Sequence, residues 1–198
     1  MSIWQTLEQA DKLATLEINS WSSAITDPIW QIFSNIPIWV PMYVIIVAFT
    51  IQRLGWKKGL IVVAAAALTF GFCDQFSNLI KHAVGRIRPL HDEFMKAGGL
   101  HVLERGGGYS FFSAHAANAF GLACSTFIGL KKCLTQNPKW LKAYGPWMFF
   151  WAAMVSISRI FVGKHYLGDV IVGSIVGSAG GLFFGYLAYR AAKRYIKG

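Results

Sequence analysis

The stretch "SISRIFVGKHYLGDV", Ser156–Val170, interrupts a long apolar region with four charged or titratable side chains. These are Arg159, Lys164, His165 and Asp169. The apolar runs on either side, about Tyr144–Ile160 and Tyr166–Tyr189, are close to the roughly 17–25 residues that a membrane-spanning helix needs. Because charge beside hydrocarbon is costly, such a group of residues at the joint between two spans indicates a functional site.

The composition fits a polytopic membrane protein. Of 198 residues, 55% are hydrophobic and only 14% are charged, whereas soluble domains carry about 25% charged residues. The 20 glycines would let helices approach closely, and the 8 tryptophans would favour membrane interfaces. The odd number of cysteines gives no support to a disulfide framework, and their places in or next to apolar segments indicate packing. They are Cys73, Cys124 and Cys133.

Five apolar segments predict an all-α bundle of transmembrane helices. They are about Ile36–Ile51, Leu60–Ile80, Phe111–Leu130, Tyr144–Ile160 and Tyr166–Tyr189. Residues 36–198 would form this domain, and residues 1–35 an amphipathic N-terminal segment of one or two helices lying partly in the interface. The alternative is a sixth span, with Asp27 facing protein, so the prediction is five to six spans. We expect no cleaved signal peptide, because the amphipathic start lacks a basic leader and a short apolar region.

The basic residues outside the site fall into three clusters that share one side of the membrane if the five spans are real. The clusters are Arg53, Lys57 and Lys58; Lys131, Lys132, Lys139 and Lys142; and Arg190, Lys193, Arg194 and Lys197. Lys and Arg collect on the cytoplasmic side, so the loop 81–110 and the turn 159–165 would share the outer face. Most of the net charge of +10 is then explained by the orientation of the chain in the membrane, which excludes nucleic acid as a partner.

The outer face nevertheless carries cations against this rule, in three stretches. They are "KHAVGRIRP", Lys81–Pro89; "FSAH", Phe112–His115; and the stretch quoted first. Interaction with lipid head groups is one explanation. The other is a site for a tetrahedral oxyanion, because arginine forks, a lysine and a serine hydroxyl suit such a ligand.

His165 and Asp169 are four residues apart, so on a helix they would share a face and could hydrogen-bond. A carboxylate fixes the tautomer of a histidine and raises its basicity, and a second histidine would supply a general acid. A structural pair and a metal site are the alternatives. The surrounding positive charge disfavours a divalent cation and favours an anion.

Together these stretches resemble the signature of the type 2 phosphatidic acid phosphatase superfamily of membrane lipid phosphatases, which shares its fold with bacterial acid phosphatases and vanadium haloperoxidases. The first part, Lys, six residues, Arg-Pro, is matched by Lys81 and Arg88-Pro89. The third, Ser-Arg, five residues, His, three residues, Asp, is matched from Ser158 to Asp169. The second, Pro-Ser-Gly-His, is "FSAH" here, with Phe112 for proline and Ala114 for glycine.

The resemblance implies a role for each matching residue. His165 would attack phosphorus and form a phosphohistidine, with Asp169 orienting it, and His115 would protonate the leaving oxygen. The phosphoryl oxygens would be held by Lys81, Arg88, Ser113 and Arg159, with the backbone amide of Ala114. No metal or cofactor is implied.

The expected function is hydrolysis of a lipid phosphate or pyrophosphate at the outer leaflet of a bacterial cytoplasmic (inner) membrane, with the site facing the periplasm or exterior. Phosphatidylglycerol phosphate, phosphatidate, undecaprenyl pyrophosphate and lipid A are the candidate substrates. A non-catalytic carrier of phosphate-headgroup lipids is the alternative, although binding alone would not require two histidines and an aspartate. Gly173, Gly177 and Gly181 repeat at intervals of four, which predicts a close helix crossing below the site. The oligomeric state stays open.

Overall fold

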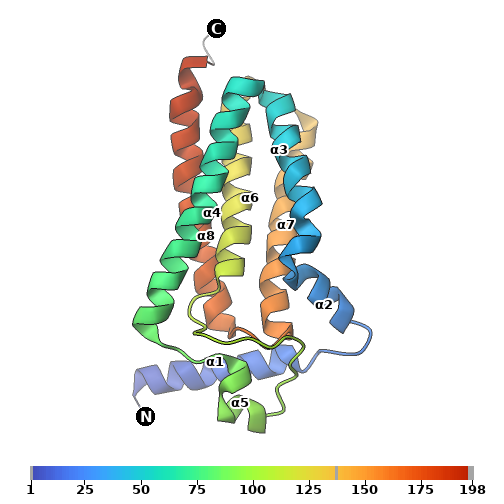
Figure 1. Ribbon diagram of the computed structural model, residues 1–198, viewed down its shortest axis with the longest axis vertical. Helices are drawn as coiled ribbons and strands as arrows, with labels where there is room; N and C mark the ends of the chain where they lie inside the picture. The colour runs from blue at the N-terminus through green and yellow to red at the C-terminus, as the bar shows by residue number, and fades with distance from the viewer. Residues whose placement is uncertain (1, 137, 196–198) are drawn as a thin grey trace.

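Five long helices form the body of the protein (Figure 1). The computed structural model describes residues 2–136 and 138–195, and within them the chain is helical, with no β-strand. The long helices are α3 (Val40–Leu54), α4 (Trp56–Val84), α6 (Ala114–Cys133), α7 (Lys139–Phe161) and α8 (Leu167–Ala192). Three stretches are long and apolar enough to cross a membrane: Ile36–Leu54, Trp56–Val84 and Leu167–Tyr195. The predicted all-α class is therefore confirmed.

The long helices begin and end where backbone chemistry requires it. Gly55, with φ of 76°, separates α3 from α4, and Gly85, with φ of 65°, ends α4 in the left-handed conformation that glycine tolerates. Two helices begin earlier than their apolar segments, α4 at Trp56 and α7 at Lys139. Lysines are good helix formers, so the apolar pattern marks only the part of the helix that hydrocarbon would cover.

Helices α6 and α8 cross very closely, as the glycine repeat predicts. A Cβ atom on Gly173 would lie 2.5 Å from the carbonyl oxygen of Ser113, and one on Gly181 would lie 2.5 Å from that of Gly121. Gly177 faces the backbone of Ala117 in the same way. The prediction of a close crossing is confirmed, and the partner is α6. All three cysteines are buried and free, in keeping with a packing role.

The N-terminal segment forms two helices, α1 (Ile3–Asn19) and α2 (Asp27–Ser34). Figure 1 shows α1 lying across one end of the bundle, at a steep angle to the long helices. The Asn19 side chain fixes it there, because its amide donates to the carbonyl oxygens of Ile160 at 3.1 Å and Phe161 at 3.2 Å. Large apolar side chains along α1 remain exposed: Ile3, Trp4, Leu7 and Leu13.

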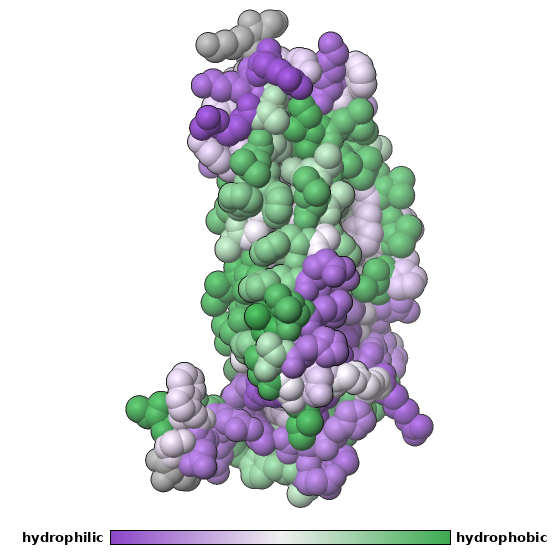
Figure 2. Space-filling view, turned by 60° about the vertical axis from the view of Figure 1, so that its left-hand side comes forward, coloured by the Kyte–Doolittle hydropathy of each residue, from purple (hydrophilic) through white to green (hydrophobic). Residues whose placement is uncertain are grey.

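The molecule has two polar ends and an apolar band between them (Figure 2). One end carries the α3–α4 and α6–α7 junctions and the end of α8, and so the three basic clusters (Figure 1); Lys197 lies outside the described residues. The other end carries α1, the short helix α5 (Glu93–Ala97) and the α7–α8 joint (Figure 1). Short 3-10 turns complete the structure: Ile36–Trp39, Pro89–His91 and Lys193–Tyr195.

Candidate active site

The joint between α7 and α8 places His165 against Asp169. The Nδ1 atom of His165 is 3.4 Å from Oδ2 of Asp169, which also accepts the backbone N–H of Tyr166 at 3.0 Å. The spacing suggested that His165 and Asp169 would share a helix. They do not, because α8 begins only at Leu167. The turn folds back instead, with the N–H groups of Lys164 and His165 both bonded to the carbonyl oxygen of Arg159.

Burial sets the protonation state of this pair. The exposed fraction is 2% for His165 and 0% for Asp169. Burial lowers the pKa of His165 to about 4, although the hydrogen bond to Asp169 acts to raise it, so the imidazole is neutral near pH 7. With Nδ1 donating its hydrogen to the carboxylate, Nε2 is left unprotonated. The pair therefore presents a free imidazole base or nucleophile.

Two arginines lie around this pair, Arg159 from the same motif and Arg88 from the first motif. Arg159 is in the last turn of α7 and is only 3% exposed, and its Nη1 atom donates to the hydroxyl of Ser34. Arg88 follows α4 and is half-buried, and burial lowers its pKa. In the part of the chain that the structure describes, the buried Nε atoms of both arginines have no hydrogen-bond partner. Guanidinium N–H groups that lack a hydrogen-bond partner are suited to binding an oxyanion.

The N-terminus of α6 meets the same end of α8. Ser113 caps α6 with its hydroxyl, and its backbone N–H donates to the carbonyl oxygen of Asp169 at 3.0 Å. Ala114 and His115 are the first two residues of the helix, whose N-terminal N–H groups and dipole favour an anion. Lys81, in the last turn of α4, is within electrostatic range of Arg88, Arg159 and Asp169. The three predicted motifs therefore converge.

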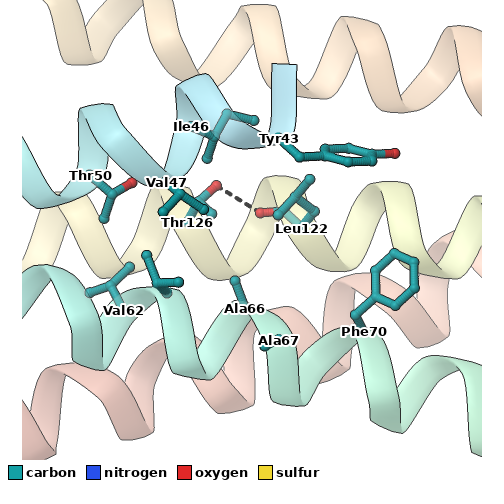
Figure 3. A pocket seen from close by; sticks show the side chains of 11 residues that line it. Tyr43, Ile46, Val47, Thr50, Val62, Ala66, Ala67, Phe70, Leu122 and Thr126 are labelled. Carbon is teal, nitrogen blue, oxygen red and sulfur yellow. Dashed lines mark hydrogen bonds between the residues drawn. The ribbon is translucent and has the colours of Figure 1, made fainter. Parts of the chain in front are cut away.

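His115 borders two cavities. The outer one has a volume of about 500 Å³ and is also lined by Ser34 and Glu104. The inner one is a small cavity of about 20 Å³. Its walls include three residues that also line a larger apolar groove of about 210 Å³ between α3, α4 and α6 (Figure 3). The three shared residues are Tyr43, Phe70 and Leu122.

The PAP2 superfamily matches residues 55–193, which is more than half of the chain and contains all three motifs. The chain belongs to the PAP2 superfamily. This confirms the resemblance that the motifs carry. PAP2 lipid phosphatases are hydrolases of phosphoric esters, so the chain is a lipid phosphatase of a bacterial membrane.

Curated PAP2 relatives cover most of the chain. A lipid A 4'-phosphatase of Bacteroides thetaiotaomicron is 36% identical over 191 residues, covering 95% of this chain and 81% of the relative. A lipid A 4'-phosphatase of Porphyromonas gingivalis is 29% identical over 177 residues, 88% of this chain and 70% of the relative. An undecaprenyl-diphosphatase of Sulfolobus acidocaldarius is 30% identical over 142 residues, 71% of this chain and 59% of the relative.

Two solved structures share the PAP2 fold of this chain. The crystal structure of a transmembrane PAP2-type phosphatidylglycerolphosphate phosphatase from Bacillus subtilis matches with a TM-score of 0.70 and 21% identity, covering 96% of this chain and 87% of that one. The crystal structure of Aquifex aeolicus LpxE matches with a TM-score of 0.60 and 19% identity, covering 86% and 92%. At these identities the two structures show the fold alone.

Glu104 is a member of this PAP2 site that the sequence did not single out. Its carboxylate lies 2.6 Å from Nζ of Lys164 and 3.8 Å from Nη1 of Arg159, and it accepts the hydroxyl of Ser34. Burial acts to raise the pKa of Glu104, but these partners outweigh it and lower the pKa. From the sequence, residue 104 was placed in the loop 81–110 and given no role. An acidic residue before a glycine run in an otherwise cationic loop was the available signal.

Arg86 is the second member that sequence reasoning missed. It was counted among the outer cations but given no role. Its Nη1 atom donates to Oδ1 of Asp169 at 2.8 Å, and its Nη2 atom donates to Oδ2 of Asp11 at 2.7 Å. Burial acts to lower the pKa of Arg86, but the two carboxylates outweigh it and raise the pKa. No spacing in the sequence connects residue 86 with residue 11.

Proposed function

We propose that this chain hydrolyses the phosphate of a membrane lipid through a covalent phosphohistidine at His165. One observation carries the proposal: a buried imidazole, neutral and paired with Asp169, lies within electrostatic range of Arg88 and Arg159, whose buried Nε atoms have no partner among the described residues. A nucleophile beside cations with unpartnered N–H donors fits phosphoryl transfer, in which positioning and charge stabilisation supply most of the catalysis.

The reaction takes two displacements. In the first, Nε2 of His165 bonds to phosphorus, the bond from phosphorus to the lipid oxygen breaks, and His115 gives that oxygen its proton. In the second, water attacks phosphorus, its proton returns to His115, and the N–P bond breaks to release phosphate. Asp169 holds the imidazole tautomer throughout. The phosphoryl oxygens and their developing charge are held by Lys81, Arg88, Ser113, Arg159 and the backbone N–H of Ala114.

The groove of Figure 3 supports a lipid rather than a soluble phosphate. Its walls are almost wholly apolar, with Ile46 and Val47 from α3 facing Val62 and Ala66 from α4. It shares three wall residues with the small cavity beside His115, so the two lie next to each other. An acyl chain in this groove would place a head group beside His115, and its burial would contribute about 0.8 kcal/mol per CH₂ group.

A phosphomonoester on a glycolipid head group, as in lipid A, is the substrate that the comparisons favour. The B. thetaiotaomicron relative, named as a lipid A 4'-phosphatase, is similar over 95% of the chain. An undecaprenyl diphosphate is the second candidate, because the S. acidocaldarius relative, named as an undecaprenyl-diphosphatase, covers a smaller share. The outer cavity of about 500 Å³ has room for part of a bulky head group.

We further propose that α3, α4, α6, α7 and α8 all span the inner membrane, forming the domain 36–198. Residues 1–35 would lie in the outer interface, which the exposed Ile3 and Trp4 of α1 support. The basic end would then be cytoplasmic and the site periplasmic. Single cysteines should show this: one replacing Lys132 should label only from the cytoplasm, and one replacing His91 from outside. Labelling of residue 91 only from the cytoplasm would reverse the orientation.

The decisive test is phosphate release by the purified protein in detergent. The panel should contain lipid A, undecaprenyl diphosphate, phosphatidylglycerol phosphate, phosphatidate and a soluble phosphomonoester. We expect turnover of a lipid, fastest with lipid A, and little with the soluble ester. Activity should persist in excess EDTA and fall with vanadate, which adopts the geometry of five-coordinate phosphorus. Binding of these lipids without phosphate release would favour the carrier, and loss in EDTA with rescue by a divalent ion would favour a metal site.

A further inference from the structure

The catalytic carboxylate proposed above has a second partner besides His165. Oδ2 of Asp169 faces His165 and the N–H of Tyr166, while Oδ1 accepts Nη1 of Arg86 at 2.8 Å. Since Asp169 is wholly buried, its charge needs such a partner, because a buried carboxylate without one is strongly disfavoured. Arg86 therefore determines how the carboxylate is turned toward the histidine.

Arg86 is itself held from two sides. Its second terminal nitrogen donates to Oδ2 of Asp11, in α1, at 2.7 Å. Its guanidinium carbon lies 3.7 Å from the centre of the Tyr166 ring, a stacking that arginine favours. Tyr166 is fixed in turn, because its hydroxyl donates to Asp92 at 2.9 Å. The guanidinium therefore has little freedom to leave Asp169.

The same α1 residues cap the helix that carries Asp169. Oδ1 of Asp11 accepts the backbone N–H of Gly168 at 2.7 Å, and the hydroxyl of Thr15 accepts that of Leu167 at 2.9 Å. These are the first two N–H groups of α8, which have no partner within the helix. The N-terminal segment, outside the matched residues 55–193, thus contacts the backbone of the catalytic turn directly and its carboxylate through Arg86.

We propose that Arg86 and Asp11 are positioning residues for the lipid phosphatase reaction. They form a chain of alternating charge, His165–Asp169–Arg86–Asp11, that orients Asp169 and sets the basicity of His165. The N-terminal segment then takes part in catalysis as well as contacting the membrane. This inference rests on the proposed role of His165 as nucleophile.

The chain of charges predicts opposite pH effects for its two outer members. Without the positive charge of Arg86, the negative charge of Asp169 acts more strongly on His165. The protonated imidazole is then stabilised, and the pKa of His165 rises. Removing the negative charge of Asp11 lets Arg86 neutralise Asp169 more fully, so the histidine pKa falls. The other titratable or charged groups that face the pair are unchanged by either substitution: Lys81 from α4, Arg88 from the loop after it, His115 from α6, Arg159 from α7, and Lys164 from the α7–α8 joint.

The experiment compares pH profiles of kcat/KM for the full chain in detergent. With Arg86→Met, we expect the acidic limb to move up by about one pH unit, with a fall in kcat of roughly 10- to 100-fold. With Asp11→Asn, whose amide oxygen still caps Gly168, the limb should move down and kcat should fall less. Arg86→Lys keeps the charge but loses the fork, so it should retain the wild-type limb with a reduced kcat.

Asp27→Asn is the matched control. Asp27 also lies in the N-terminal segment and also pairs with the loop between α4 and α6, through His101 at 2.9 Å, but among the described residues no side-chain hydrogen bond or ion pair joins it to the catalytic turn. It should leave the pH profile unchanged. If Arg86→Met fails to fold, the pH profile of Asp11→Asn decides. Wild-type pH profiles for the folded Arg86→Met and Asp11→Asn variants, or an equal shift in Asp27→Asn, would overturn the inference. The proposed function has its own tests, which are phosphate release from the lipid panel and the loss of turnover in His165→Ala.

Discussion

The two ends of the molecule carry similar cations in opposite environments. At the basic end, Arg53, Lys57 and Lys132 are exposed, and none of the ion pairs in the described residues involves them. At the site end, Arg159 is 3% exposed, and Arg86 lies between two carboxylates. Exposed cations need only water and lipid head groups, whereas buried ones need partners. Positive charge alone therefore does not show what a cation does here. Burial distinguishes the cations of the site from those that indicate membrane orientation.

The strongest test of this contrast is removal of the nucleophile. His165→Ala should reduce kcat by about 10⁴-fold or more, because neither displacement can begin. His101→Ala, in an exposed histidine of the same face, is the control and should keep near-normal activity. Quenched turnover with radiolabelled lipid should give an acid-labile, alkali-stable phosphoprotein in the wild type only. Near-normal turnover in a folded His165→Ala preparation would leave the phosphate-binding carrier as the better description.

A smaller effect should separate the arginines of the two ends. Arg159→Lys should lower kcat/KM about 100-fold, since one ammonium group cannot replace a buried fork that binds two oxygens. Arg53→Lys should have no measurable effect, because Arg53 is exposed and lies over the rings of Phe49 and Trp140 at 5.1 and 5.2 Å. Similar losses in both variants would mean that burial does not distinguish the two ends.

The sequence predicted those parts of the molecule that repeat or that follow a fixed spacing. The apolar segments located the long helices, and the glycines at 173, 177 and 181 predicted a close crossing. The three motifs located His115, His165 and the cationic residues around them, which the structure brings to one end of the bundle. Their roles remain predictions until the variants are measured.

The contacts of the N-terminal segment could not be predicted, because they join residues far apart in the chain. Asp11 contacts Arg86 and Gly168, which are 75 and 157 positions away. Scattered among apolar residues, Asp11 looked like one of several charges on an interfacial helix. Only the path of α1 across the end of the bundle places it beside the catalytic turn (Figure 1). Helix periodicity fixes which residues share a face but not where that face docks.

The smallest predicted effect concerns Glu104, the carboxylate placed among the cations of the site end. A phosphate that binds Arg159 and Lys164 must compete with this carboxylate for both. Glu104→Gln keeps the size of the side chain and an oxygen for the hydroxyl of Ser34 but removes the competing charge. We therefore expect KM to fall about threefold to fivefold, which corresponds to about 1 kcal/mol, with kcat unchanged.

The pH dependence of this difference follows from the lowered pKa of Glu104. The carboxylate stays ionised at neutral pH and in mild acid, so the KM difference should persist there. It should disappear only when the pH falls below the usual range of a glutamate, where the wild-type side chain becomes neutral too. Glu93→Gln, an exposed carboxylate 2.8 Å from Lys96, is the matched control and should not change KM. A rise in KM or a parallel loss of kcat in Glu104→Gln would show instead that Glu104 holds Arg159 in its working position.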